Sequence, residues 1–309
     1  MKKNIVQKII NTIRQATPLE IRQKIGPFIA ETHNYFHNLQ STKKPIVLSI
    51  NETLTCILEN NLSVIRFGDG EITLMDDHDL SFQKKNKELS EKLEAIIKSK
   101  HEGLLICIPG IWGNLSGFED YARLFIIHHL YRQHHIWKKL LSDETVYGDA
   151  YITRHYLGFK DKSHAHTTFK KFFQLWDSRD IVLIEGSKSR LGVGNDIFAN
   201  VKSLQRILCP TEDAYLKYFE IKQEATKVNK NKLILIALGP TAKVLAYELF
   251  LLGYRVIDIG HIDMEYDMFI RNEVTQKKVP YKYFNEINER TPEDCTDSKY
   301  LEQILVTIL

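Results

Sequence analysis

Residues 233–259, LILIALGPTAKVLAYELFLLGYRVIDI, contain a complete strand–helix–strand unit. The apolar run 233–238 is followed by a Gly-Pro-Thr turn, after which 241–252 is long and apolar enough for a helix. Gly253 separates this helix from a second apolar run at 255–259. Two strands joined through a helix lie parallel in one sheet, because such a crossover returns the chain to the same end. The segment therefore predicts a parallel α/β sheet.

The same alternation extends along most of the chain. Helical stretches at 86–99 and 119–141 separate apolar runs that are mostly continuous, as in strands covered on both faces. The further apolar runs lie at 62–67, 104–108, 181–185 and 205–208. We expect an open α/β fold, a mostly parallel sheet with helices on both faces.

The composition of the chain is that of an ordinary globular protein. It has 309 residues, of which 43% are hydrophobic and 26% are charged, which is enough for one large domain. The formal net charge of +3 gives no strong basic field, so we expect no nucleic-acid partner. The four cysteines form no CxxC pair, which indicates reduced thiols and a cytoplasmic protein. No apolar stretch reaches the roughly 20 residues of a membrane-spanning helix.

Residues 1–44 differ from the rest and predict a basic amphipathic helical extension and linker, ahead of a domain at 45–309. Within residues 1–16, isoleucines and a valine recur at helical spacing, with lysines and an arginine on the other side. No small-residue cleavage site follows, so this is not a signal peptide. Three uses stay open for the helix: docking on its own domain, docking on a second copy in a homo-oligomer, or peripheral contact with the inner face of a membrane.

Glycines and charged side chains follow most of the predicted strands. In open α/β sheets the carboxyl ends of the strands form the edge at which ligands bind. The segments in question are GDGE at 68–71, the glycine-rich loop 186–196, the Gly-Pro-Thr turn at 239–241 and HIDMEYD at 261–267.

Asp69 and Glu71 are the candidate metal ligands. In an extended or turning chain their spacing places both carboxylates on one side, whereas on a helix they would point about 200° apart. Two carboxylates beside phosphate-binding elements suit Mg²⁺ or Mn²⁺. The competing interpretation is a solvated turn that happens to be acidic.

Two segments have the features of an anion site. In the loop 186–196, three glycines allow close approach to the backbone, and the fork of Arg190 suits a diphosphate. The loop matches neither GxxxxGK[ST] nor GxGxxG, which argues against ATPases and dinucleotide-binding proteins. Thr241 is a candidate helix N-cap, whose neighbouring amides either bind phosphate or merely begin the helix.

The acidic segment after the last strong strand supplies candidates for a general base. A carboxylate or imidazole at this edge could take a proton from an incoming hydroxyl, although structural acids in a loop explain the pattern equally well. The candidates are His261, Asp263, Glu265 and Asp267.

Five separate stretches, in order, resemble the signatures of the GT-D-type glycosyltransferases, bacterial enzymes that extend sugars on serine-rich repeat adhesins and other surface glycans. The resemblance covers about residues 45–290. The stretches are VIRFGDGEI at 64–72, EGSKSRLGVGNDIF at 185–198, RILCP at 206–210, IALGPTA at 236–242 and DIGHIDMEYDMF at 258–269.

The resemblance implies a Rossmann-like sheet and a metal-dependent transferase. Its donor would be a UDP-sugar, with UDP-glucose expected, and its acceptor a hydroxyl of a growing glycan or glycopeptide. The family's Asp-x-Glu motif falls on Asp69 and Glu71, which would hold Mn²⁺ (or Mg²⁺) against the diphosphate. The remaining motif positions imply a substrate site at Arg66, Gly68, Glu185, Ser189, Arg190, Gly192, Gly194, Asn195, Asp196, Gly239, Pro240 and Thr241.

Two positions depart from the expected family pattern. Lys243 stands where a small or hydroxylated residue is expected, so it either adds a cation near the phosphates or faces solvent. Asp267 replaces an expected glutamate, which puts its role as a base in doubt.

Two other functions stay open: a non-catalytic nucleotide-sugar-binding partner of another transferase, and a different α/β transferase such as a methyltransferase.

Overall fold

The computed structural model describes residues 44–309, and the predictions for the N-terminal extension lie outside this range apart from its last residue. The described residues form one nine-stranded sheet in the order β1-β4-β3-β2-β8-β7-β5-β6-β9, with every neighbouring pair parallel. The strands are β1 (Ile46–Val47), β2 (Ser63–Arg66), β3 (Leu104–Ile108), β4 (Val146–Asp149), β5 (Asp180–Gly186), β6 (Ser203–Cys209), β7 (Leu233–Ala237), β8 (Val256–Asp258) and β9 (Ile304–Thr307).

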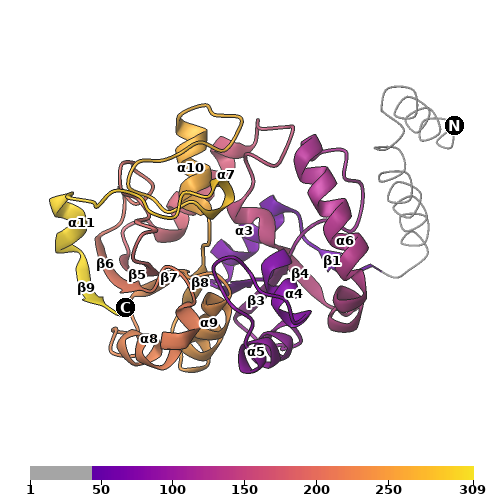
Figure 1. Ribbon diagram of the computed structural model, residues 1–309, viewed down its shortest axis with the longest axis horizontal. Coiled ribbons are helices and arrows are strands. Elements are labelled where there is room, and N and C mark those ends of the chain that lie inside the picture. Colours follow the sequence, from indigo (N-terminus) through magenta and orange to yellow (C-terminus); the bar gives the residue numbers. More distant parts are fainter. Residues whose placement is uncertain (1–43) are drawn as a thin grey trace, which may run out of the picture.

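Helices cover both faces of the sheet (Figure 1). One face carries α4 (Asp69–Met75), α5 (Lys87–Ile97), α6 (Asp120–Leu140), α8 (Tyr218–Ala225) and α9 (Thr241–Leu251), and the other carries α3 (Ile50–Glu59), α7 (Ala165–Trp176) and α10 (Ile262–Ile270). The short elements are α11 (Ser298–Glu302) and the 3-10 turns η1 (Ala150–Thr153), η2 (Ala214–Lys217) and η3 (Asn285–Ile287). Within residues 44–309, no helix combines the length and apolar character needed to cross a bilayer.

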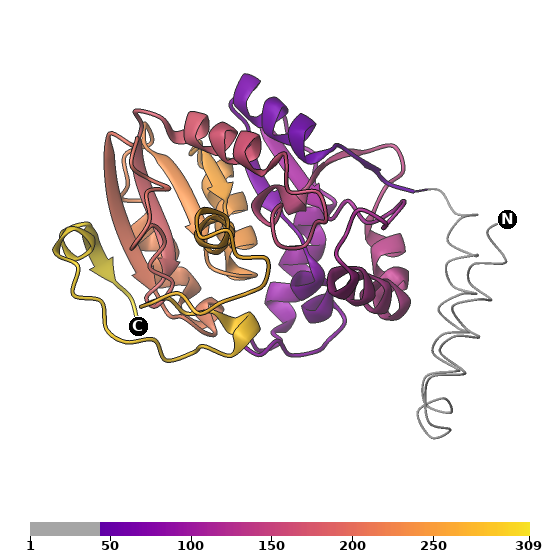
Figure 2. The ribbon, with the colours of Figure 1, turned by 90° about the horizontal axis from the view of Figure 1, so that it is seen from above.

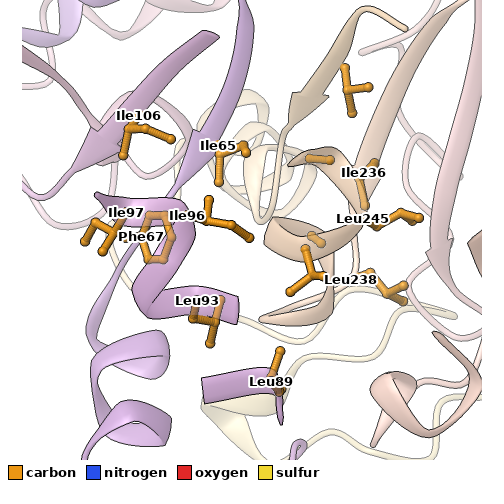
Figure 3. Close-up of a cluster of buried hydrophobic side chains, with 14 of the residues drawn as sticks. Ile65, Phe67, Leu89, Leu93, Ile96, Ile97, Ile106, Ile236, Leu238 and Leu245 are labelled. Carbon is orange, nitrogen blue, oxygen red and sulfur yellow. The ribbon is translucent and has the colours of Figure 1, made fainter. Parts of the chain in front are cut away.

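Alternate residues of the strands divide the core into two layers. In β2, Ile65 packs with the helices of one face, while its neighbour Val64 packs with those of the other. Figure 3 shows the first layer, where Leu93 of α5 and Leu245 of α9 lie beneath Ile65 and Ile106. Because both faces are buried, the strands are apolar at successive positions, which explains the continuous runs in the sequence.

The predicted elements are confirmed and several more are present. All six predicted strands lie in the sheet, and the three predicted helices correspond to α5, α6 and α9. Strands β1, β4 and β9 and helices α3, α4, α7, α8, α10 and α11 are not among the predicted elements. The missed strands lie at or next to the sheet edges: β1 has two residues, β4 contains a glycine, and β9 is only partly buried.

The centre of the sheet contains a topological switch point. From β2 the chain moves outward through β3 and β4, and it later returns from the other side through β7 to β8, which pairs with β2. In such sheets the crevice at the carboxyl ends of the two central strands is the usual ligand site. The segment after α10 continues along one side of the molecule toward α11 and β9 (Figure 2).

Candidate active site

A cavity of about 620 Å³ lies at the carboxyl ends of β2 and β8. It is lined by residues that follow β2, β4, β5, β6, β7 and β8, by the first turns of α6, and by part of the segment 276–286. Ten predicted site residues lie on its wall: Arg66, Gly68, Asp69, Glu71, Ser189, Gly239, Pro240, His261, Asp263 and Glu265. Eight do not: Glu185, Arg190, Gly192, Gly194, Asn195, Asp196, Thr241 and Asp267.

The backbone at Asp69 and Glu71 is helical, which corrects the expectation of an extended turn. Both residues lie in the first turn of α4, because Gly68 begins the helix and its N–H donates to Glu71 Oε2 over 2.8 Å. The two carboxylates consequently have different surroundings. Asp69 is exposed, and no hydrogen bond or ion pair of its carboxylate is present among the described residues, whereas Glu71 is buried.

Lys243 lies beside Glu71 inside the cavity wall. Its ammonium is 3.0 Å from Glu71 Oε1 and 3.1 Å from Asp258 Oδ2, and the side chain is almost fully buried. Arg66 approaches Asp258 from the other side, with Nη2 3.0 Å from Oδ1 and Nε donating to the Asp258 carbonyl. Burial alone would raise the pKa of Asp258, but the charges of Arg66 and Lys243 outweigh it and the pKa is lowered. Lys243 therefore adds a cation to this site and does not face solvent.

The glycine-rich loop contributes little of its side-chain chemistry to the cavity. Arg190 donates through Nη1 to the carbonyls of Tyr281 and Glu293, so its guanidinium holds the C-terminal segment in place and does not point at a ligand. Glu185 is fully buried and pairs with Arg206. Only Gly186, Ser189 and Leu191 of this part of the chain reach the wall.

The Gly-Pro-Thr turn forms a second part of the wall through its first two residues. Gly239 has φ of +52°, a conformation that glycine adopts without strain. The expectation that Thr241 caps α9 is wrong: Pro240 is the N-cap, and the Thr241 hydroxyl is buried against Gln83 Oε1 at 3.4 Å. The start of α9 nevertheless faces the cavity through Gly239 and Pro240, and a helix N-terminus favours anions there.

Helix α10 separates Glu265 from Asp263 and Asp267, which lie one turn apart on one face, and His261 is the N-cap of the helix. The carboxylates of Asp263 and Asp267 both accept from the buried ammonium of Lys282, at 2.6 and 2.7 Å. Asp263 also accepts from the Gly192 N–H and the Asn195 amide, so it organises the glycine-rich loop. Asp267 is fully buried and outside the cavity. Both carboxylates therefore hold parts of the fold together, and neither is free to act as a base.

Glu265 has the surroundings expected of a proton acceptor. It lines the cavity, and its Oε2 accepts from the backbone N–H groups of Tyr156 and Leu157 at 2.8 and 3.0 Å. Burial raises the pKa of Glu265, and this effect exceeds the opposite effect of the two N–H donors and of Arg154. A carboxylate with a raised pKa is a stronger base than an ordinary glutamate.

His261 is paired with a residue that the sequence did not single out. Its Nε2 lies 3.0 Å from Glu286 Oε1, which also receives a hydrogen bond from Arg154 Nη2 at 2.5 Å. Burial would raise the pKa of Glu286, but the charges of His261 and Arg154 outweigh it and the pKa is lowered. No motif marks Glu286 or Arg154, because Glu286 lies in the short 3-10 turn η3 and Arg154 directly follows the 3-10 turn η1, outside the quoted sequence signatures.

On the helix α4 the two carboxylates of Asp69 and Glu71 no longer lie on one side, but both border the cavity, so the residues present fit a divalent cation held chiefly by Asp69 and by the oxygens of a bound diphosphate. Asp69 has a free carboxylate, and Glu71 keeps unused lone pairs beside Gly68 and Lys243. No group of three or more histidines, cysteines or acids able to enclose a metal occurs in the described part of the chain. Magnesium-type sites commonly use one or two carboxylates together with substrate phosphates, which is the composition available here.

Comparison with known proteins identifies the same architecture. A model of the glycosyltransferase GT-D fold matches residues 64–287. A Streptococcus pneumoniae protein named glycosyltransferase GlyD is 38% identical over 265 residues, 85% of this chain and 32% of that protein. A Streptococcus gordonii protein named probable glycosyl transferase Gly is 39% identical over 265 residues, 85% of this chain and 39% of that protein. The chain thus spans about a third of the length of these curated relatives.

Two solved structures support the assignment at the level of the fold. One, described as the highly conserved domain of unknown function 1792 with a distinct glycosyltransferase fold, has a TM-score of 0.85 and 36% identity, covering 89% of this chain and 100% of that one. Another, a new glycosyltransferase from Streptococcus sanguinis, has a TM-score of 0.82 and 37% identity, covering 86% of this chain and 100% of that one. The predicted fold class and resemblance are confirmed, and the chain belongs to the GT-D-fold glycosyltransferase family.

Proposed function

We propose that this domain transfers a hexose, glucose in the first instance, from a UDP-sugar to a hydroxyl of a growing glycan on a surface glycoprotein or polysaccharide. One observation carries the proposal. The free carboxylate of Asp69, the start of α9 and the base candidate Glu265 all border the same cavity at the switch point of the sheet. The relatives named as glycosyltransferases support the reaction class.

The charges around the cavity suggest a role for each charged residue in binding the donor. Asp69 and Glu71 would hold Mn²⁺ or Mg²⁺, which when bound neutralises the negative charge that develops on the leaving diphosphate. The ammonium of Lys243 and the start of α9 place further positive potential beside that diphosphate. Arg66 and Asp258 keep the lysine in position, since both are buried and paired with each other.

Glu265 is the proposed general base. The acceptor hydroxyl oxygen forms a bond to the anomeric carbon as the bond from that carbon to the β-phosphate oxygen breaks. The bonding electrons leave with UDP, and the hydroxyl proton passes to the Glu265 carboxylate. Asp263 and Asp267 are occupied by Lys282, and His261 by Glu286, so Glu265 is the better-placed base.

The experiment that tests this proposal measures UDP release from a panel of UDP-sugars with Mn²⁺, in the presence and absence of soluble glycosides. Wild-type protein is expected to turn over one donor, and Asp69→Asn to lose at least about 100-fold of that activity while its melting temperature stays near that of the wild type. Asp77→Asn, an exposed acid two residues past α4, is the control. Full activity of a folded Asp69→Asn protein would show that the proposed metal site is wrong. No UDP release from the wild-type protein with any donor would favour the alternative function, a non-catalytic nucleotide-sugar-binding partner of another transferase.

The alternative methyltransferase function makes an opposite prediction. Thermal stabilisation of the protein by S-adenosylmethionine, without any effect of UDP or chelator, would support it.

The N-terminal extension is proposed to bring a cytoplasmic enzyme to the inner face of the membrane. Deletion of residues 1–40 is then expected to abolish liposome binding.

A further inference from the structure

The first turns of α6 present large apolar side chains to solvent. Tyr121, Leu124 and Phe125 are 54%, 61% and 54% exposed. Tyr121 and Phe125 are four residues apart, so they lie on one face of the helix, and both line the cavity, whereas Leu124 does not. Exposed apolar side chains next to a cavity mark a binding surface more often than a solvated one.

The two aromatic side chains lie across the β2–β8 pair from the parts of the cavity wall that β5 and β7 supply. Gly186 ends β5, Ser189 follows it and Gly239 follows β7, and both strands are on one side of the β2–β8 pair. Helix α6 connects β3 to β4 on the other side of that pair (Figure 1). A nucleotide diphosphate bound at the first set of elements would leave the α6 side for the second substrate.

The ring of Phe125 is held in place from within the helix. It stacks on His129, with centroids 6.5 Å apart and an interplanar angle of 7°. His129 is itself buried and its Nε2 accepts from the Trp137 indole over 2.8 Å. The contact restrains the Phe125 ring on the His129 side, and its exposed part offers a flat apolar surface to a ligand.

The proposed base faces the same side. The segment that anchors Glu265 is joined to the start of α6, because the Gly158 carbonyl accepts from the Glu119 N–H over 2.9 Å. Glu265 is anchored to the N–H groups of Tyr156 and Leu157, and Leu157 also lines the cavity. A molecule resting on Tyr121 would therefore have one edge near this carboxylate.

We infer that Tyr121 and Phe125 form the acceptor subsite, on which the apolar face of a neutral pyranose ring stacks with a hydroxyl directed at Glu265. The C–H groups of a sugar face are weakly positive and match the negative face of an aromatic ring. The inference rests on the proposed function and adds the residues that would bind the acceptor and the kind of sugar ring that they would bind, a neutral pyranose.

The experiment compares Tyr121→Leu, Phe125→Leu and the double variant with Leu124→Ala, which changes an exposed apolar residue of the same turn. Leucine keeps the helix and the apolar character but removes the ring. The ratio of transfer to acceptor-independent hydrolysis, with p-nitrophenyl glycosides of hexoses and N-acetylhexosamines as acceptors, is expected to fall on the order of tenfold in each single variant through a higher acceptor KM. Leu124→Ala is expected to match the wild type.

Binding is measured independently of turnover by saturation-transfer-difference NMR with the same glycosides. The signal is expected to weaken in the aromatic variants and to persist in Leu124→Ala. An unchanged acceptor KM and NMR signal in the double variant would overturn the inference even in an active transferase. A wild-type protein that binds the glycosides through these rings but neither hydrolyses nor transfers would instead count against the proposed function alone. If the double variant chiefly dissociated a dimer in size-exclusion chromatography, the α6 surface would be a subunit interface and the inference would be wrong.

Discussion

The ammonium of Lys243 lies 3.0 Å from Glu71 Oε1, so a buried lysine already neutralises one of the two acids of the Asp-x-Glu motif. A metal ion at Glu71 would have to share that carboxylate with the ammonium. Like charges a few ångströms apart repel by more inside a protein than in water, because the effective dielectric constant is lower. Lys243 is therefore expected to weaken metal binding in the absence of substrate and to strengthen diphosphate binding.

Lys243→Met tests both effects with little change in side-chain volume. Glu71 keeps the Gly68 N–H and Asp258 keeps Arg66, so neither acid is left without a partner. The Kd for Mn²⁺ without nucleotide, measured by electron paramagnetic resonance, is expected to fall about three- to tenfold. The Kd for UDP is expected to rise. Lys85→Met, which removes an exposed lysine paired with Asp77, should change neither constant, and equal Mn²⁺ affinity in both variants would contradict this account.

Glu265→Gln tests the proposed base through pH. Because burial raises the pKa of this carboxyl, the wild-type kcat/KM is expected to rise with pH through a midpoint above the ordinary glutamate value of about 4.3. Glutamine is still able to accept from the Tyr156 and Leu157 N–H groups, so the fold should persist. Its kcat is expected to fall about 100- to 10,000-fold and the acidic limb to disappear. If the variant kept the acidic limb of the pH profile, a residue other than Glu265 would be the base.

Glu286→Gln tests the contact between the C-terminal segment and the cavity wall. The pKa of Glu286 is lowered in the folded protein, so its contribution to stability is present above the unfolded pKa and is lost as the pH falls through the folded one. Arg154 is 38% and Glu286 23% exposed, so solvent screens the pair, and removing the charge of Glu286 is expected to cost about 1 kcal/mol at pH 7. Urea unfolding at pH 7 measures this cost. Wild-type stability at neutral pH would show that the pair is unimportant.

Asp149→Asn tests a buried acid with the opposite shift. Asp149, at the end of β4, accepts from the Tyr151 and Gly110 N–H groups, and burial raises its pKa to about 7. The raised pKa favours the protonated form, so the free energy of unfolding is expected to decline as pH rises from about 4 to 7. Asparagine mimics that neutral form and should remove the decline, which amounts to at most about 4 kcal/mol.

The measurement for this prediction is a series of urea unfolding curves between pH 4.5 and 7.5. Asp161→Asn, at an exposed acid, is the control and should follow the wild type. Parallel curves for wild type and Asp149→Asn across the whole range would show that Asp149 ionises normally.

The sequence alone determined the class of fold and the edge at which the site lies. Strands such as LLICI at 104–108 are apolar at every position because both faces of a parallel sheet are buried, and that pattern is local. The ligand edge followed from the same reasoning, since Asp69, Gly239 and His261 each come directly after a strand. Edge strands β1 and β9 escaped detection because a short or half-exposed strand lacks a continuous apolar run.

Only the tertiary structure decided which polar side chains share the cavity and what each one contacts. The motif shows that Asp263 and Glu265 are near in sequence, and both border the cavity, but the ammonium of Lys282 pairs with Asp263 while only backbone N–H groups hold Glu265. The sequence left open whether Lys243 faces the site or solvent. In the structure it is buried at the site, because α9 packs against β2 and β8 and places its ammonium beside Glu71 and Asp258. Such pairings join residues up to about 190 positions apart, and the charge of a site depends on them rather than on local pattern.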